Sequence, residues 1–151
     1  VHYRKELNFS DETIETARKE LSRVLLPLKQ ADIKAGLAGI TLSDAYDEES
    51  YRHFLDQLDD DMNTPNAYEV IFNTVKQLNT ALRSKEIDFE TVSKYRNAVE
   101  KMLNVLGIVV DKVVLSDKDK ELFAKWNDAK SAKDFAKADE YRNELTARGL
   151  L

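Results

Sequence analysis

The sequence predicts an all-α protein, an antiparallel helix bundle followed by a small C-terminal helical hairpin. The four glycines and two prolines among 151 residues leave few places for sharp turns, which favours long helices over many short strands. Apolar residues recur mainly at intervals of three or four rather than in alternation. With 42% hydrophobic and 34% charged residues, the chain can bury a core, so disorder is not expected.

The first predicted helix follows Ser10, a good N-cap residue, and Asp11 and Glu12 place negative charge where the helix dipole favours it. Pro27 lacks an amide hydrogen and is expected to kink or end this helix near its last turn. The predicted apolar stripe comprises Ile14, Ala17, Leu21, Val24, Leu25 and Leu28.

A loose stretch flanked by Gly36 and Gly39 is expected next, with Leu37 and Ile40 anchored in the core. A second helix then presents one apolar face and runs into the acidic residues 59–61. This face comprises Tyr51, Phe54, Leu55 and Leu58.

Thr64 as N-cap and Pro65 at the first helical position predict the start of a third helix. A fourth helix is expected to begin near Asp88, and Gly107 is placed to close it in the left-handed conformation. The predicted core positions of these two helices are Ala67, Ile71, Val75, Leu78, Leu82, Val92, Tyr95, Val99, Leu103 and Leu106. Residues 108–115 favour β structure and are either a short strand or an extended linker.

The C-terminal segment predicts a helical hairpin that looks like a separate small unit. Ser116 and Asp119 have the spacing of a capping box, residues 131–134 form the expected turn, and Gly149 is expected to end the second helix. Phe135 and Trp126 are interpreted as hairpin core rather than as platforms for stacking bases. The predicted apolar positions are Leu122, Trp126, Ala129, Phe135, Ala138, Tyr141 and Leu145.

Catalytic motifs are missing from the sequence. There is no cysteine, which excludes disulfides and cysteine-based zinc sites, and His2 and His53 lie far apart. The glycines match neither a phosphate loop nor a dinucleotide motif. No apolar run is long enough to span a membrane and no signal segment is visible, so we expect a cytoplasmic protein that acts through a binding surface. Both ends of the chain look like cuts in a longer polypeptide.

The net charge of −5 is concentrated in one segment. Residues 40–63 carry one basic and eight acidic side chains, whereas residues 117–151 carry eight of each. A nearly neutral hairpin can still recognise RNA by shape, stacking and base-edge hydrogen bonds. The charge therefore leaves RNA open as a partner, although it would provide little nonspecific affinity, and DNA is not expected.

Three strings together resemble the C-terminal portion of bacterial cysteinyl-tRNA synthetase, a class I aminoacyl-tRNA synthetase. They are HYR at 2–4 with LNFS at 7–10, DDDMNTP at 59–65, and KDFAKAD at 133–139 with RNEL at 142–145. They follow the order and spacing of the family. The resemblance implies a bundle at residues 1–112 that contacts the anticodon stem of tRNA. It also implies that residues 116–151 are the start of a truncated anticodon-binding domain.

The same resemblance implies the partners and cofactors. The partners would be tRNA-Cys and the N-terminal catalytic domain of the same polypeptide. ATP, magnesium and a zinc ion would be used by that catalytic domain, which this chain lacks, so this chain alone is expected to be non-catalytic. Anticodon contacts would fall on Lys130 and Asp139, and Phe135 occupies a position where the family has an aromatic residue.

Two other interpretations remain open from the sequence. One is the related cysteine ligase of mycothiol synthesis, which shares the acidic turn and the bundle but is not expected to carry the hairpin at residues 117–148. The other is a helical protein-interaction module with no role in RNA binding. The acidic run at residues 59–61 could also suggest a cation site, but the helix start at Thr64 and Pro65 accounts for it more simply.

Overall fold

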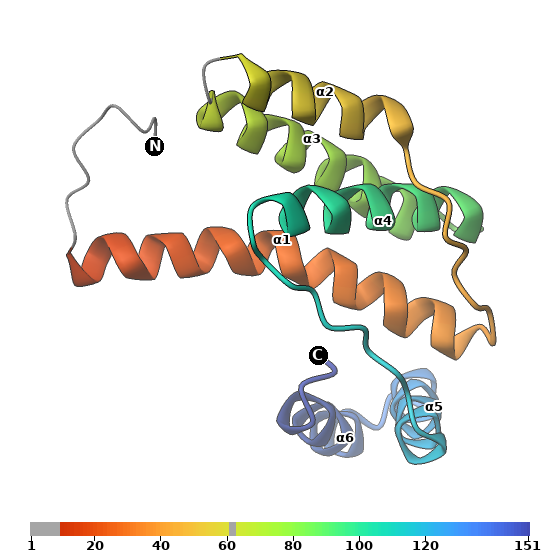
Figure 1. The fold of residues 1–151 in the computed structure, drawn as a ribbon. Helices are drawn as coiled ribbons and strands as arrows, with labels where there is room; N and C mark the ends of the chain where they lie inside the picture. The colour runs from red at the N-terminus through yellow and green to blue at the C-terminus, as the bar shows by residue number, and fades with distance from the viewer. Residues whose placement is uncertain (1–9, 61–62) are drawn as a thin grey trace.

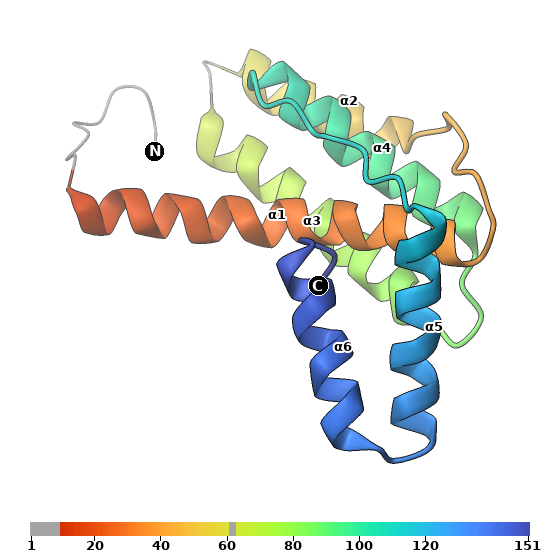
Figure 2. The same ribbon diagram turned by 90° about the horizontal axis from the view of Figure 1, so that it is seen from below.

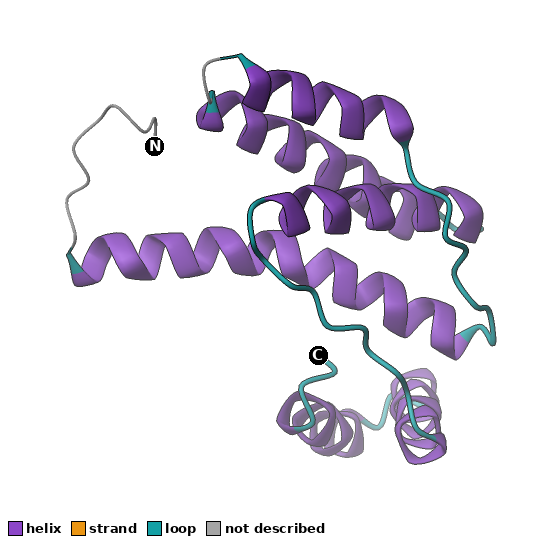
Figure 3. Cartoon of the chain, viewed as in Figure 1, coloured by secondary structure: helices purple, strands orange, loops and turns teal. Residues whose placement is uncertain are grey.

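The computed structural model describes residues 10–60 and 63–151, and within these ranges it is helical with no strand, as predicted (Figures 1 and 3). The expectations for residues 1–9 and 61–62 lie outside the described residues. No helix in the described ranges is long and apolar enough to cross a membrane. The helices are α1 (Asp11–Leu37), α2 (Glu48–Asp59), α3 (Thr64–Leu82), α4 (Phe89–Val105), α5 (Asp117–Ser131) and α6 (Phe135–Ala147).

Helix α1 continues past Pro27 to Leu37, so the expectation that Pro27 lies near its last turn is wrong. Figure 1 shows α1 changing direction near its middle, as a proline-induced kink would produce. An internal proline costs roughly 3 kcal/mol in a helix. Beyond the proline, Leu28 and Ala31 are completely buried, and this burial offsets the cost.

The N-terminal part of α1 is less buried than its apolar stripe predicts. Val24 and Leu28 lie in the core, but Ile14 is exposed because that part of the helix extends beyond the bundle (Figure 1). Leu21 is exposed because it borders an open groove between α1 and α3. The predicted core anchors Leu37 and Ile40 are also exposed, because α1 ends at the edge of the bundle. A local hydrophobic pattern cannot report how far the neighbouring helices reach.

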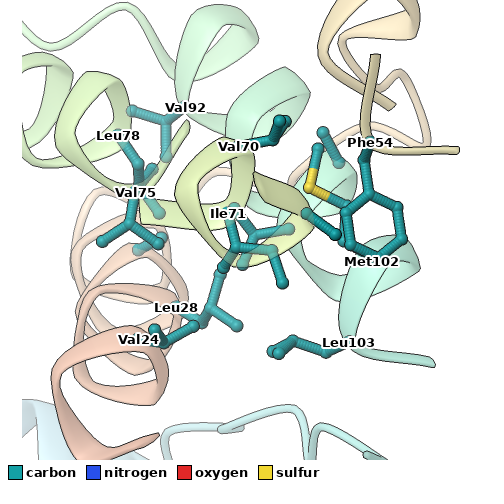
Figure 4. Close-up of a cluster of buried hydrophobic side chains, with 14 of the residues drawn as sticks. Val24, Leu28, Phe54, Val70, Ile71, Val75, Leu78, Val92, Met102 and Leu103 are labelled. Atoms are coloured by element: carbon teal, nitrogen blue, oxygen red, sulfur yellow. The ribbon is translucent and has the colours of Figure 1, made fainter. Parts of the chain in front are cut away.

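Helices α1 to α4 share one core, shown in part in Figure 4. Phe54 from α2 and Met102 from α4 are fully buried beside Ile71 from α3. The predicted core positions of α3 are all buried, and those of α4 are buried or half-buried. The buried members are Val24, Leu28, Ala31, Phe54, Ala67, Val70, Ile71, Val75, Leu78, Leu82, Val92, Ala98, Val99, Met102 and Leu103.

The helix boundaries confirm most of the predicted caps. Asp88 caps α4, and Gly107 adopts a positive φ of 82° just after it. Asn63 rather than Thr64 is the N-cap of α3: its side chain accepts from the amide of Asn66, and Thr64 is the first helical residue. Asn and Thr are both good N-cap residues, and the sequence prediction chose Thr64 because Pro65 follows it. Residues 108–115 form an extended linker without a strand partner in the described chain.

The hairpin of α5 and α6 has a second, smaller core. Its buried members are Ile33, Leu122, Phe123, Leu145 and Leu150. Ile33 comes from α1, so the hairpin packs against the same helix that supports the bundle. Figure 2 shows α5 and α6 running at a steep angle to α1, with the loop that connects them at the end away from α1. The predicted boundary between residues 112 and 116 stays a prediction, and the shared α1 is what connects the two cores.

Candidate nucleic-acid interface

The turn of the hairpin is built from a Schellman-type helix end. The amide of Asp134 donates to the carbonyl of Ala129 at 2.9 Å, and the amide of Lys133 donates to the carbonyl of Lys130 at 3.2 Å. Lys133 has a φ of +56°, a left-handed conformation that costs a non-glycine residue about 1 kcal/mol. Asp134 then caps α6 by accepting from the amide of Lys137. The turn is therefore tight and well defined.

Phe135 follows this turn as the first residue of α6, and 68% of its surface is exposed. Its interpretation as hairpin core is wrong. Ala138 and Leu145 fill the face of α6 toward α5, and a residue at the first helical position lies beyond that packed region. An exposed aromatic ring at the end of a hairpin is available to stack on an unpaired base.

Lys130 and Asp139, the two predicted polar contacts, are both exposed. Asp139 lies four residues after Phe135, on the same face of α6. Lys130 lies at the C-terminal end of α5, just before the loop that connects α5 to α6. The hairpin thus presents a cation before its turn, and an aromatic ring and a carboxylate after it.

The ammonium group of Lys130 is not entirely free, because its Nζ lies 4.2 Å from the centroid of the Trp126 ring. This is a cation–π contact, and Trp126 is half-buried and makes an edge-type ring contact with Phe123. Trp126 was interpreted as hairpin core, and it does pack against the second hydrophobic cluster while leaving part of its ring accessible.

The open end of the hairpin is closed by polar contacts. Arg148 donates to Asp119 at 2.9 Å and also bonds Glu144, joining the end of α6 to the start of α5. Ser116 and Asp119 form the predicted capping box. The amide and hydroxyl of Ser116, then Arg148, lower the pKa of the Asp119 carboxyl. Of these contacts, the ion pair between Arg148 and Asp119 crosses between the two helices.

A buried ion-pair network that was not predicted from the sequence orients the hairpin on the bundle. Arg96 of α4 is 1% exposed and pairs with Asp32 of α1 at 2.8 Å and with Glu100. Burial would lower the pKa of Arg96, but the bonds and charges of Asp32 and Glu100 together outweigh it and raise that pKa. Asp32 also accepts from the backbone amide of Val113 at 3.2 Å. One carboxylate thus joins α1, α4 and the linker that leads to the hairpin.

Charged residues at core-facing helix positions were the available signal for this network. Arg96 lies between the predicted core residues Val92 and Val99, and Asp32 lies four residues after Leu28. Both charges interrupt a run of buried positions. Their pairing across 64 residues could not be predicted, because no local pattern links them.

Comparison with known proteins places this geometry in a family context. Residues 53–110, from the middle of α2 into the linker, match the model of the DALR domain. The chain is 35% identical to cysteine-tRNA ligase from Geobacillus sp. (strain WCH70) and 32% identical to that from Geobacillus thermodenitrificans (strain NG80-2). It is 31% identical to cysteine-tRNA ligase from Proteus mirabilis (strain HI4320).

These matches cover 99 to 100% of the chain but only 33 to 34% of the relatives. The chain therefore spans about a third of the length of these proteins. The resemblance predicted from the three sequence strings is confirmed. Residues 53–110 match the DALR domain family, and along its whole length the chain corresponds to the C-terminal part of cysteine-tRNA ligases.

Proposed function

We propose that this chain is the tRNA-binding part of a cysteine-tRNA ligase, which positions tRNA-Cys through its anticodon stem and anticodon for ATP-dependent aminoacylation. The observation that carries the proposal is the similarity to such ligases over the whole chain. The exposed Phe135 adds support, because its ring at the end of the hairpin is accessible to an unpaired base.

In this proposal the hairpin turn recognises the unpaired anticodon. Phe135 stacks on a base, Asp139 accepts from an exocyclic amino group of cytosine or guanine, and Lys130 donates to a phosphate or to an acceptor on a base edge. Stacking on one aromatic ring contributes about 1 to 3 kcal/mol. Because residues 117–151 carry balanced charge, recognition depends on these contacts more than on nonspecific attraction.

The exposed part of α1 supports docking of the catalytic domain of the same polypeptide. Leu21 of α1 and Tyr68 and Phe72 of α3 line an apolar groove of about 490 Å³. All three side chains are more than one-third exposed, and Ile14 lies further along the same helix. An exposed apolar surface of this kind is typical of an interface. We assign it to the catalytic domain because the relatives are about three times as long as this chain.

The proposal assigns aminoacylation, and with it ATP, magnesium and zinc, to that catalytic domain, and this chain contributes binding alone. Among the described residues, no group of three acidic or histidine side chains is placed to hold a metal ion. The chain's role is to present the tRNA, and the proposed location is the cytoplasm, where aminoacylation takes place.

Ribonuclease footprinting of tRNA-Cys with the full chain tests the proposal. We expect protection of the anticodon arm, and loss of that protection when Lys130 and Asp139 are both replaced by alanine. Asp117→Ala with Lys118→Ala is the matched control, because it removes one exposed charge of each sign at the end of α5 that is opposite the turn. An unprotected anticodon arm, both with this chain and with the complete ligase, would contradict the proposal.

One structural feature and one experimental outcome distinguish the proposal from the two alternatives. The hairpin at residues 117–148, which the cysteine ligase of mycothiol synthesis is not expected to carry, is present as α5 and α6. A helical protein-interaction module would leave the tRNA unprotected while its apolar groove bound another protein. Protection that is equal for tRNA-Cys and for an unrelated tRNA would show RNA binding without selection of the anticodon.

A further inference from the structure

A cleft of about 600 Å³ lies between α1 and α5, outside the hairpin turn. One face of α1 and one face of α5 form its walls, and the C-terminal turn contributes to it as well. Its apolar lining residues are Leu26, Ile33, Leu37, Phe123, Trp126, Leu150 and Leu151. The floor is thus suited to a flat or apolar group.

The polar lining of this cleft has one sign of charge. Lys29 and Lys34 from α1 and Lys130 from α5 line it, together with two amides, Gln30 and Asn127. The cleft has no acidic lining side chain in the described structure, although the whole chain has a net charge of −5. Three cations with no acidic side chain beside them in the lining create a local positive potential, which selects an anionic ligand.

The three lysines keep donors available for such a ligand. Lys34 donates one hydrogen from its Nζ to the carbonyl of Leu82 at 2.8 Å, and an ammonium group has three. Lys130 lies over the Trp126 ring, a contact that uses its charge without a hydrogen bond. The ammonium of Lys29 reaches the C-terminal turn, since a side chain at Gly149 would begin 3.6 Å from its Nζ.

We propose that this cleft binds one nucleotide of an unpaired RNA strand. The lysines bind the phosphate, the apolar floor around Trp126 contacts the base, and Gln30 and Asn127 donate to or accept from the edge of the base. This inference rests on the proposed tRNA binding and extends it. The strand that reaches the hairpin turn also contacts α1, so a single RNA segment joins the bundle to the hairpin.

Charge complementarity favours RNA over the other occupants of such a cleft. An apolar helix from a partner protein would bury the three ammonium groups without a counter-charge, which is costly. A nucleotide supplies both the phosphate for the lysines and a flat base for the apolar floor. Amide side chains are suited to base edges because each carries both donors and an acceptor.

Trp126 provides a direct readout because it is the one tryptophan in the sequence. The full chain is titrated with a single-stranded oligoribonucleotide that has the anticodon-loop sequence of tRNA-Cys. We expect the fluorescence of Trp126 to change as the oligoribonucleotide is added and to reach a plateau when the cleft is saturated. Lys29→Glu should weaken binding about tenfold, because it removes a phosphate contact and adds a repulsive charge. Lys29→Gln should reduce the slope of log affinity against log salt by about 0.7.

Lys76→Glu is the matched control, because Lys76 is an exposed lysine of α3 that does not line the cleft. It makes the same change in net charge and should leave the affinity unchanged. Circular dichroism of each variant checks that the helices are intact. If Lys29→Glu lowers the helicity, Lys29→Gln still tests the phosphate contact, because it removes the positive charge without adding a negative one.

The possible outcomes separate this inference from the proposed function. If Lys29→Glu and Lys29→Gln bind as the parent does while replacing Lys130 and Asp139 abolishes binding, the cleft assignment is overturned and the proposed function stands. An equal response of Trp126 to a polyglutamate peptide at the same ionic strength would overturn the choice of RNA. If the oligoribonucleotide does not bind the chain, the cleft assignment is overturned, whereas the proposed function is decided separately by the footprint of tRNA-Cys with the complete ligase.

Discussion

The bundle and the hairpin are both built from α-helices, but they use their side chains differently. In the bundle, Phe54 is completely buried and Arg96 is held by two carboxylates in the interior. In the hairpin, Phe135 is 68% exposed, and Arg148 makes its ion pairs at the surface. Among the described residues, the bundle core contains fifteen buried hydrophobic residues, and the hairpin core contains five, one of them from α1.

This difference indicates a division of roles between the two regions. A large core with an internal ion pair gives a rigid support, because core packing and buried polar bonds specify one arrangement. A small hairpin can bury only a few residues of each helix and leaves the rest facing solvent. Its exposed aromatic and charged side chains are then available for a partner, and the hairpin is held to the bundle by packing on Ile33 and by the linker bond to Asp32.

The largest expected effect comes from Arg96→Ala. It leaves Asp32 and Glu100 without their cation in a buried site, so the free energy of unfolding should fall by about 3 to 5 kcal/mol. Urea unfolding followed by circular dichroism measures this change. Arg83→Ala, at an exposed position after α3, is the control and should change stability by less than about 0.5 kcal/mol. Equal effects of the two substitutions would show that the internal network does not support the bundle.

The two phenylalanines give a matched comparison of the regions. Phe54→Ala should destabilise the protein by about 3 to 5 kcal/mol, because it opens a cavity at a fully buried position. Phe135→Ala should change stability by less than about 0.5 kcal/mol, yet it should weaken tRNA-Cys binding by about 1 to 3 kcal/mol through lost stacking. Thermal unfolding and filter binding measure the two quantities. A large loss of stability in Phe135→Ala would place that ring in the core after all.

A smaller effect is expected at the hairpin turn. Lys133→Gly relieves the left-handed backbone at φ +56° and should stabilise the hairpin by up to about 1 kcal/mol. Amide hydrogen exchange of α5 and α6 measures this gain, and the exchange of α3 amides provides an internal reference. Slower exchange in α3 alone, or faster exchange in the hairpin, would contradict the strain assigned to Lys133.

The smallest effect concerns pH. The pKa of Asp119 is lowered from its usual value of 3.8 by its bonds with Ser116 and Arg148. A lowered pKa in the folded state means that the stabilisation is present above pH 3.8 and is lost as the pH falls through the folded-state value. Asp119→Asn should therefore reduce hairpin stability near neutral pH and flatten its decline in acid. Acid titrations of both proteins, followed by hydrogen exchange, measure this, and parallel declines would contradict it.

The sequence alone predicted most of the local structure. Helix starts at Ser10, Asp88 and Ser116 and the helix end at Gly107 follow from side-chain and backbone chemistry within a few residues, so their patterns could be read directly. The core of α3 was predicted because its apolar spacing matches one helical face. Lys130, Phe135 and Asp139 were identified by resemblance to a family, and the structure places all three at exposed positions.

Only the tertiary structure decided which predicted apolar positions are buried and how the two regions are joined. Ile14 and Phe135 have the spacing of core residues but remain exposed, because no other helix in the described part of the chain covers them. Arg96 and Asp32 meet across the bundle, and α1 meets α5 at the lysine-lined cleft, through contacts between residues far apart in the chain. Local chemistry determines where a helix begins and ends, whereas burial and charge pairing depend on which surfaces the folded chain brings together.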